Sequence, residues 1–179
     1  MSSRVQSVSV DSVADYLLMK IDPEAGDSIT NMKLQKLLYY CQGWHLAAYG
    51  VPLFNASIEA WEHGPVVRGV WGRFSRHGPQ SIPPDEARPD RAMAIPEPMR
   101  RLIDDVWDRY GEMHAYRLRD MTHEEAPWRE VYREDCRDAV IPDEAMRLFF
   151  DEESARLLDA AELGPVTDPA SLEWARTAG

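Results

Sequence analysis

The stretch MKLQKLLYYCQGWH, residues 32–45, decides how this chain folds. Apolar and small side chains recur in it every three or four residues, the spacing that places them on one face of an α-helix. Thr30 precedes the stretch and can cap the free amide groups of the first turn, and Gly50 follows it and can adopt the left-handed conformation that ends a helix. We therefore predict a helix between these two residues at the centre of the core, with Lys33 and Lys36 off the apolar face and directed toward water.

The same spacing predicts further helices around this central one. Apolar residues recur in this way over residues 9–20, 65–77, 97–110 and 115–122, a short helix follows Pro127, and another begins at Pro142. Proline suits the first turn of a helix, because an amide hydrogen there would have no partner within the helix. We therefore expect the third helix to begin at Gly64-Pro65. Residues 81–98 are rich in proline and charge, which predicts a surface loop.

One short segment alternates as a β-strand does. In residues 57–61, Ile58 and Ala60 would share one face and their neighbours the other. Residues 51–54 could pair with this strand in a small hairpin, which must lean on helices because an isolated pair of strands is marginal in water. The sequence thus predicts a mainly α fold: a single compact helical domain with a small β-hairpin or a two- to three-stranded sheet.

Length and composition narrow the class of protein. The 179 residues suffice for one domain, and 31 acidic against 20 basic side chains give a net charge of −11, which argues against a nucleic-acid binder because such proteins need a basic face. No apolar run approaches the roughly 20 residues that span a membrane. Cys41 and Cys136 match no metal or redox spacing. We expect a cytoplasmic protein with reduced thiols that binds neither nucleic acid nor membrane.

The catalytic and metal-binding patterns that we sought are absent or incomplete. His123 begins a pattern typical of zinc proteases, but Pro127 stands where the second histidine ligand would be. Cys41 and His45 lie one helical turn apart, as a nucleophile and its base could. Both fall on the apolar face of the predicted central helix, and we interpret them as core residues. We therefore predict no cofactor, no metal and no enzymatic activity.

Two short stretches, each at a junction between predicted elements, remain as candidates for a functional surface. EAWEHGPVV, residues 59–67, packs a strand end, a tight junction and a helix start together; it is either a structural corner or an exposed rim where Glu62 and His63 meet a partner. LRDMTHEEAPW, residues 118–128, joins two predicted helices, and we interpret Trp128 as a core anchor. The first stretch leads into a basic segment that forms either a patch for a partner or a solvated face (Arg68, Arg73, Arg76 and His77).

Three segments in this order and spacing, residues 32–45, 58–67 and 118–128, resemble the Panacea antitoxin domain, also called the SocA-like or phage-associated protein family. The resemblance covers residues 8–150 and leaves 151–179 as a C-terminal helical extension and tail. It implies a mainly helical fold with a small sheet, which agrees with the patterns above. No enzymatic activity is established for the family.

What the resemblance implies is an antitoxin of a bacterial or phage toxin–antitoxin system that neutralises a cognate protein toxin, encoded by a neighbouring gene, through direct contact. One family member instead delivers its toxin to the ClpXP protease, so a proteolytic adaptor for a ClpXP-type protease is the alternative. A hydrolase that uses Glu62, His63 and His123 is a third hypothesis. For the surface that contacts the partner we select the rim around the junction, namely Trp61, Glu62, His63 and Arg68.

Overall fold

The computed structural model describes residues 7–136 and 138–163, and over these ranges the fold is mainly α, as predicted. Eight α-helices and one two-stranded sheet are present in the described residues. The helices are α1 (Val10–Met19), α2 (Asn31–Tyr49), α3 (Arg68–Phe74), α4 (Pro89–Met93), α5 (Glu97–Tyr110), α6 (Ala115–Glu124), α7 (Ala126–Arg129) and α8 (Asp143–Leu163), and the strands are β1 (Glu59–Trp61) and β2 (Gly64–Val66).

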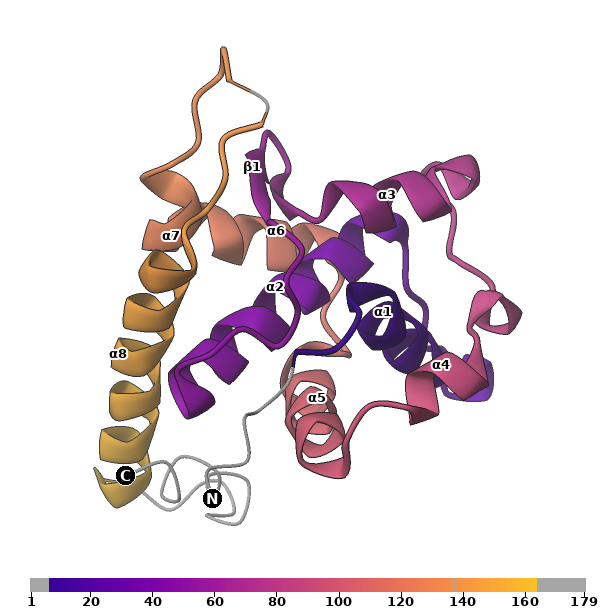
Figure 1. Cartoon of the computed structure of the whole chain (residues 1–179), viewed down its shortest axis with the longest axis horizontal. Helices are drawn as coiled ribbons and strands as arrows, with labels where there is room; N and C mark the ends of the chain where they lie inside the picture. The colour runs from indigo at the N-terminus through magenta and orange to yellow at the C-terminus, as the bar shows by residue number, and fades with distance from the viewer. Residues whose placement is uncertain (1–6, 137, 164–179) are drawn as a thin grey trace.

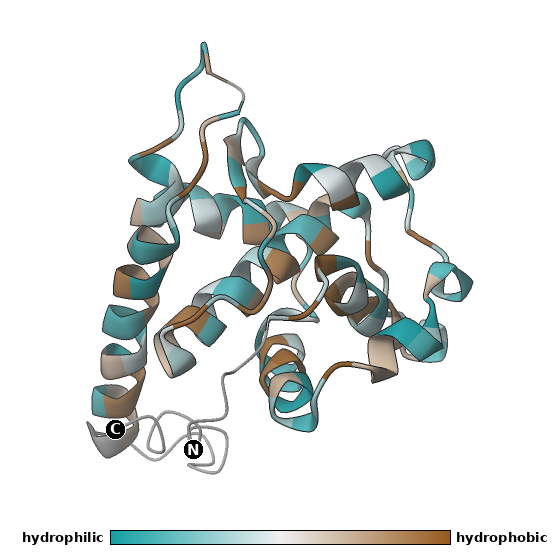
Figure 2. Cartoon of the chain, viewed as in Figure 1, coloured by the Kyte–Doolittle hydropathy of each residue, from teal (hydrophilic) through white to brown (hydrophobic). Residues whose placement is uncertain are grey.

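Helix α2 lies at the centre, and α1, α5, α6 and α8 pack around it (Figure 1). The predicted caps are confirmed: the Thr30 hydroxyl accepts a hydrogen bond from the Lys33 amide at 3.2 Å, and Gly50 ends the helix at φ +68°. Coloured by hydropathy, α2 shows polar and apolar residues side by side, unlike a helix that has one solvent-exposed face (Figure 2). Its polar residues are therefore part of the core.

The prediction that Lys33 and Lys36 face water is wrong, because both side chains are buried. Neighbouring elements surround α2 on every side, which leaves no solvated face for residues outside its apolar stripe. Each ammonium group instead donates to a backbone carbonyl: Lys33 to Gly111 at the end of α5, and Lys36 to Pro65 in β2 at 3.0 Å. A buried charge requires such a partner, and both lysines thereby tie distant segments to α2.

Glutamines of α2 bind the loops beside it in the same way. The Gln42 side chain accepts from the Leu53 and Phe54 amides and donates to the Phe54 carbonyl, and the Gln35 side chain accepts from the Val67 amide at 2.9 Å. These loops have no strand partner at those groups, and buried backbone groups need one. The central helix thus supplies hydrogen bonds that a sheet would otherwise supply.

The hairpin differs from the predicted one. Strand β1 pairs with β2, not with residues 51–54, in the register Glu59 to Val66 and Trp61 to Gly64. Gly64 and Pro65 therefore form a strand, and the third helix begins only at Arg68. The physical reason is Gly64, whose φ of +98° reverses the chain directly after residues 62–63.

The predicted alternation in residues 57–61 is confirmed, since Ile58 and Ala60 are buried. On its other side β1 receives residues 139–141: the Ala60 amide donates to the Ala139 carbonyl and the Ile141 amide to the Ile58 carbonyl, both at 2.8 Å. Strand β1 therefore lies between two neighbours, and the second comes from late in the sequence.

Residues 81–98 are not the plain loop that their composition predicts. They contain a 3₁₀ turn at Pro84–Glu86 and helix α4, which packs on α1. Two buried isoleucines at the ends of the segment, Ile82 and Ile95, hold it against the core.

Helix α8 begins at Asp143, as its proline predicts, and continues without a break past Phe150 to Leu163. A Cβ atom on Gly43 would lie 2.0 Å from the Phe150 ring, so only glycine lets α8 pack this closely on α2. The Phe150 ring meets Tyr39, Tyr40 and Trp44 edge to face, a favoured aromatic geometry. The two longest helices are thus joined through an aromatic cluster.

None of the helices in the described ranges has the length and apolarity that crossing a membrane requires. Cys41 and His45 are buried in α2, with His45 Nδ1 2.8 Å from the Val51 carbonyl oxygen, which confirms their interpretation as core residues.

The central position of α2 predicts a large cost for Leu37→Ala. Leu37 is fully buried, and the cavity left by the leucine should lower the free energy of unfolding by about 2–5 kcal/mol. Tyr116→Ala is the control, because Tyr116 is 64% exposed and its loss should cost under about 0.5 kcal/mol. Urea denaturation of both variants measures this, and equal costs would contradict the central role of α2.

Glu125, between α6 and α7, is held by hydroxyl groups of Tyr39 and Tyr40, each of which donates to its carboxylate at 2.9 Å. Burial raises the pKa of Glu125 from 4.5 to about 7. The folded state therefore holds the proton more tightly than the unfolded chain does, and the resulting stability is present below pH 4.5 and lost as the pH rises to about 7.

Glu125→Gln should abolish this dependence. The free energy of unfolding of the wild type, minus that of the variant, should fall by up to about 1.4 kcal/mol per pH unit between pH 4.5 and 7. Denaturation curves at several pH values measure it. Glu124→Gln, at the exposed neighbouring position, is the control, and the same slope in both variants would refute the assignment to Glu125.

Candidate functional site

The predicted rim residues lie on one groove. Trp61, Glu62, His63 and Arg68 all line an open groove of about 590 Å³ beside the β1–β2 hairpin. Helix α2 contributes Met32 and Lys36, and α3 contributes Arg68 and Trp71. The loop after α7 contributes four further residues (Tyr132, Arg133, Glu134 and Cys136). Four segments that are far apart in sequence thus meet at a single concave surface.

Glu59 fixes the geometry of the aromatic rim. Its carboxylate accepts hydrogen bonds from the Trp61 indole at 2.7 Å and from two nitrogens of Arg68 at 2.7 and 3.1 Å. The Arg68 guanidinium also lies 5.4 Å from the centre of a Trp61 ring, within the range of a cation–π interaction. Trp61 and Arg68 are therefore held in place on the surface, with Glu62 and His63 exposed at the turn beside them.

A stack of three rings supports the groove. His123, Trp128 and Tyr132 stack nearly parallel, with centroid distances of 4.0 Å and 4.6 Å. The Trp128 indole donates to the Trp61 carbonyl at 2.8 Å, which joins the stack to the hairpin. Trp128 is buried, which confirms its interpretation as a core anchor, while Tyr132 at the end of the stack lines the groove.

Lys36 lies among the lining residues and is only 1% exposed. Its ammonium group donates to the Pro65 carbonyl, and burial together with Arg119 lowers its pKa to about 7. The absent side chain of Gly64 makes room for it, since a Cβ there would lie 2.6 Å from Lys36 Cε. The tight turn and the buried lysine therefore depend on one another.

The sequence predicts the four exposed or half-buried rim residues of the groove but not its other lining residues. Trp71 and Tyr132 are not among the predicted rim residues, and the helical pattern predicts Lys36 in water. No local pattern could have found Lys36, because its burial depends on elements far away in the sequence. The stack could have been suspected from the spacing of His123, Trp128 and Tyr132 along the junction between helices.

The three residues of the hydrolase hypothesis do not share the groove. Glu62 and His63 line it, whereas the described lining residues do not include His123. The His123 ring stacks on Trp128, and its pKa is lowered by burial first and then by Arg119 and Lys36. Within the described ranges no group of three or more His, Cys, Asp or Glu side chains could hold a metal ion.

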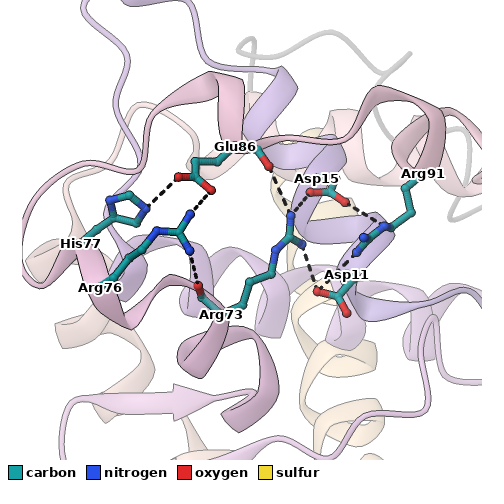
Figure 3. Close-up of polar contacts among 7 residues, drawn as sticks. All are labelled: Asp11, Asp15, Arg73, Arg76, His77, Glu86 and Arg91. Carbon is teal, nitrogen blue, oxygen red and sulfur yellow. Dashed lines mark hydrogen bonds and ion pairs between the residues drawn. The ribbon is translucent and has the colours of Figure 1, made fainter.

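The basic residues of the α3 region divide between two roles (Figure 3). Arg73 pairs with Asp11 and with the buried Asp15, which Arg91 also approaches at 3.5 Å, so Arg73 joins α3 to α1. Arg76 and His77 pair with Glu86 in the 3₁₀ turn. Arg73 is thus largely an internal tie instead of part of a solvated face, while Arg68 and Arg76 remain exposed at 59% and 61% of their side chains.

The fold and the groove describe a small helical domain whose concave surface is suited to contact another molecule. Comparison with protein families adds the identity of the domain: the model for "Antitoxin SocA-like, Panacea domain" matches residues 34–129. The chain therefore belongs to the SocA-like antitoxin family that carries the Panacea domain, as the three segments predicted. The matched range includes α2 from Leu34 onward, the hairpin, and the junction that carries His123 and Trp128.

One curated relative is Antitoxin SocA of Caulobacter vibrioides (strain NA1000 / CB15N), which is 44% identical over 77 residues. These residues are 43% of this chain and 40% of that relative, so the likeness spans less than half of either protein. No solved structure matches the chain.

The dependence of the turn on Gly64 predicts a cost for Gly64→Ala. Alanine would have to adopt a φ of +98° while its Cβ meets Lys36 and Thr122, and the variant should lose more than about 1 kcal/mol of stability. The control is Gly72→Ala in α3, where nothing lies within 4 Å of the new Cβ and helix propensity should add up to about 1 kcal/mol. Thermal unfolding measures both, and a neutral Gly64→Ala would show that the turn tolerates a side chain.

Proposed function

We propose that this protein neutralises a toxin by binding it directly through the groove beside the β1–β2 hairpin. The toxin is a protein encoded by a neighbouring gene, and the contact surface is centred on Trp61, Glu62, His63 and Arg68. The protein acts in the cytoplasm as a binding partner and not as a catalyst, and it does not need nucleic acid. Membership in the antitoxin family supports the general role.

The observation that carries the proposal is the meeting of all four predicted residues on one groove. Tryptophan and arginine are the residue types most enriched at the energetic centres of protein interfaces. Trp61 and Arg68 are already ordered by Glu59, and such preorganisation lowers the entropy cost of binding. A concave, aromatic surface with fixed side chains is therefore well suited to a protein partner.

The net charge of −11 supports the same proposal. A basic toxin would be drawn to so acidic a protein, because complementary fields raise the rate of association and disfavour wrong partners. Masking of the toxin then requires only that the groove bind at or beside its active surface.

We propose further that the antitoxin domain extends over residues 8–150, beyond the matched 34–129. Helices α1 and α8 both pack against α2, and Phe150 reaches Gly43 at the centre of the fold. The elements outside the match thus complete the core that holds the groove. Residues 151–179 form the proposed extension and tail; α8 enters this range, and 164–179 lie outside the described residues.

Co-expression with the product of the adjacent gene tests the proposed function. That product should stop growth when it is expressed alone, and this protein should restore growth and co-purify with the product. A neighbour that is harmless alone, or that stays lethal beside this protein, would refute the antitoxin role. An unchanged toxin lifetime in cells with and without a ClpXP-type protease supports masking, and a shortened lifetime only with the protease supports the adaptor.

Charge changes on the groove should weaken neutralisation while the protein stays folded. Glu62→Lys and Arg68→Gln alter exposed side chains, and each should raise the Kd for the toxin by about tenfold or more if it lies at the interface centre. Asp108→Lys, an exposed acid on α5, is the control for net charge and should change the Kd by less than about threefold. Calorimetric titration measures the Kd, and two groove variants that bind like the wild type would move the interface elsewhere.

A further inference from the structure

Lys36 is a buried cation that no opposite charge faces in the described part of the chain. Its one hydrogen bond among the described residues goes to the Pro65 carbonyl, and none of the described carboxylates forms an ion pair with it. Arg68 and Arg73, in contrast, each bind carboxylates. The charged side chain that acts on Lys36 is Arg119, which repels it. An ammonium group removed from water without a counter-charge is costly.

The position of Lys36 indicates where a counter-charge for its ammonium group could come from. The residue lines the groove and yet is almost fully buried. The acidic lining residues, Glu62 and Glu134, are exposed and leave Lys36 unpaired. Trp61 and Trp71 also line the groove, and their ring centroids lie 5.8 Å from each other. Two tryptophans and a buried lysine without a counter-charge among the described residues therefore line the same groove.

We propose that the groove receives the carboxylate of one Asp or Glu side chain of the toxin, which forms an ion pair with Lys36. This inference rests on the proposed function and names the chemistry that the groove recognises. A carboxylate on a short apolar stem could pack its stem against the tryptophans of the groove and would supply the missing counter-charge through a charge-assisted hydrogen bond. The exposed Glu62 and Glu134 disfavour a more highly charged anion such as a phosphate dianion at the same place.

Lys33 is a matched control for Lys36. Both lysines lie on α2, both are buried, and both donate to a backbone carbonyl. Lys33, however, binds Gly111 and lies 5.8 Å from the Trp107 ring centre, away from the residues that line the groove. Methionine keeps the approximate length of either side chain and removes the charge.

The experiment measures the Kd of the adjacent-gene toxin for the wild type, Lys36→Met and Lys33→Met, with circular dichroism to verify folding. Lys36→Met should raise the Kd by about tenfold or more, the usual effect of losing a hydrogen bond to a charged group. Lys33→Met should stay within about threefold. Equal Kd values for the wild type and a folded Lys36→Met, or equal losses in both variants, would overturn the inference.

The wild type provides a second measurement that does not depend on how Lys36→Met folds. Carboxylate binding requires the protonated ammonium, so the affinity should fall as the pH rises above about 7, by at most about tenfold per unit. The His63→Gln background removes the histidine on the groove, and Lys33→Met should show the same fall as the wild type. The other charged or titratable groups near Lys36 come from α6 and from the groove walls (Arg119, His123, Glu62, Arg68, Arg133, Glu134 and Cys136). An affinity that is constant from about pH 7 to 9 would contradict the inference.

Asp→Asn and Glu→Gln substitutions in the toxin identify the carboxylate. One of them should raise the Kd as Lys36→Met does, and the double variant should be no weaker than either single one, which is the signature of a direct pair. If no acidic residue of the toxin couples to Lys36 while Glu62→Lys and Arg68→Gln still weaken binding, the proposed ion pair is wrong. The proposal that the groove binds the toxin is then retained. If none of these groove variants changes the Kd, the proposed binding surface itself fails.

Discussion

The burial of α2 on all sides is the constraint on which the rest of the structure depends. A helix that is surrounded in this way cannot send its polar residues to water, so each of them needs a partner inside the protein. Gln35, Gln42, Lys33 and Lys36 meet this need by binding backbone groups of the neighbouring loops, of strand β2 and of the end of α5. The polar residues of α2 therefore connect the fold, while its leucines and aromatic rings fill the core.

The groove is a consequence of these connections. Lys36 and Gln35 hold the second strand and the residue after it against α2, and Glu59 then orders Trp61 and Arg68 at the edge. The ring stack from α6 and α7 reaches the hairpin through one hydrogen bond to the Trp61 carbonyl. A few specific contacts with buried residues thus position a surface that is assembled from four segments. The exposed residues of that surface contribute little to holding the segments together.

The sequence predicts those features that depend on neighbouring residues. Thr30 and Gly50 marked the ends of α2, and the apolar spacing of 97–110 gave α5 with its observed bounds, because caps and helical faces are local properties. Gly64-Pro65 misled the prediction, since proline favours both a helix start and a short edge strand, and the left-handed φ of Gly64 decides between them. Lys36 could not be placed either, because a lysine on a helix is buried only when helices from elsewhere cover it. The sequence therefore predicts the exposed rim of the groove but not the buried Lys36 that also lines it.

The order of the contacts along the chain has a consequence for biosynthesis. Strand β1 is complete only when residues 139–141 lie beside it, and α2 is covered only when Phe150 settles on Gly43. When only the first two thirds of the chain have been synthesised, β1 therefore lacks its second neighbour and α8 does not yet cover the central helix. The groove takes its final form near the end of translation, so a chain cut short by a premature stop would expose hydrophobic surface to quality control without ever presenting a finished groove.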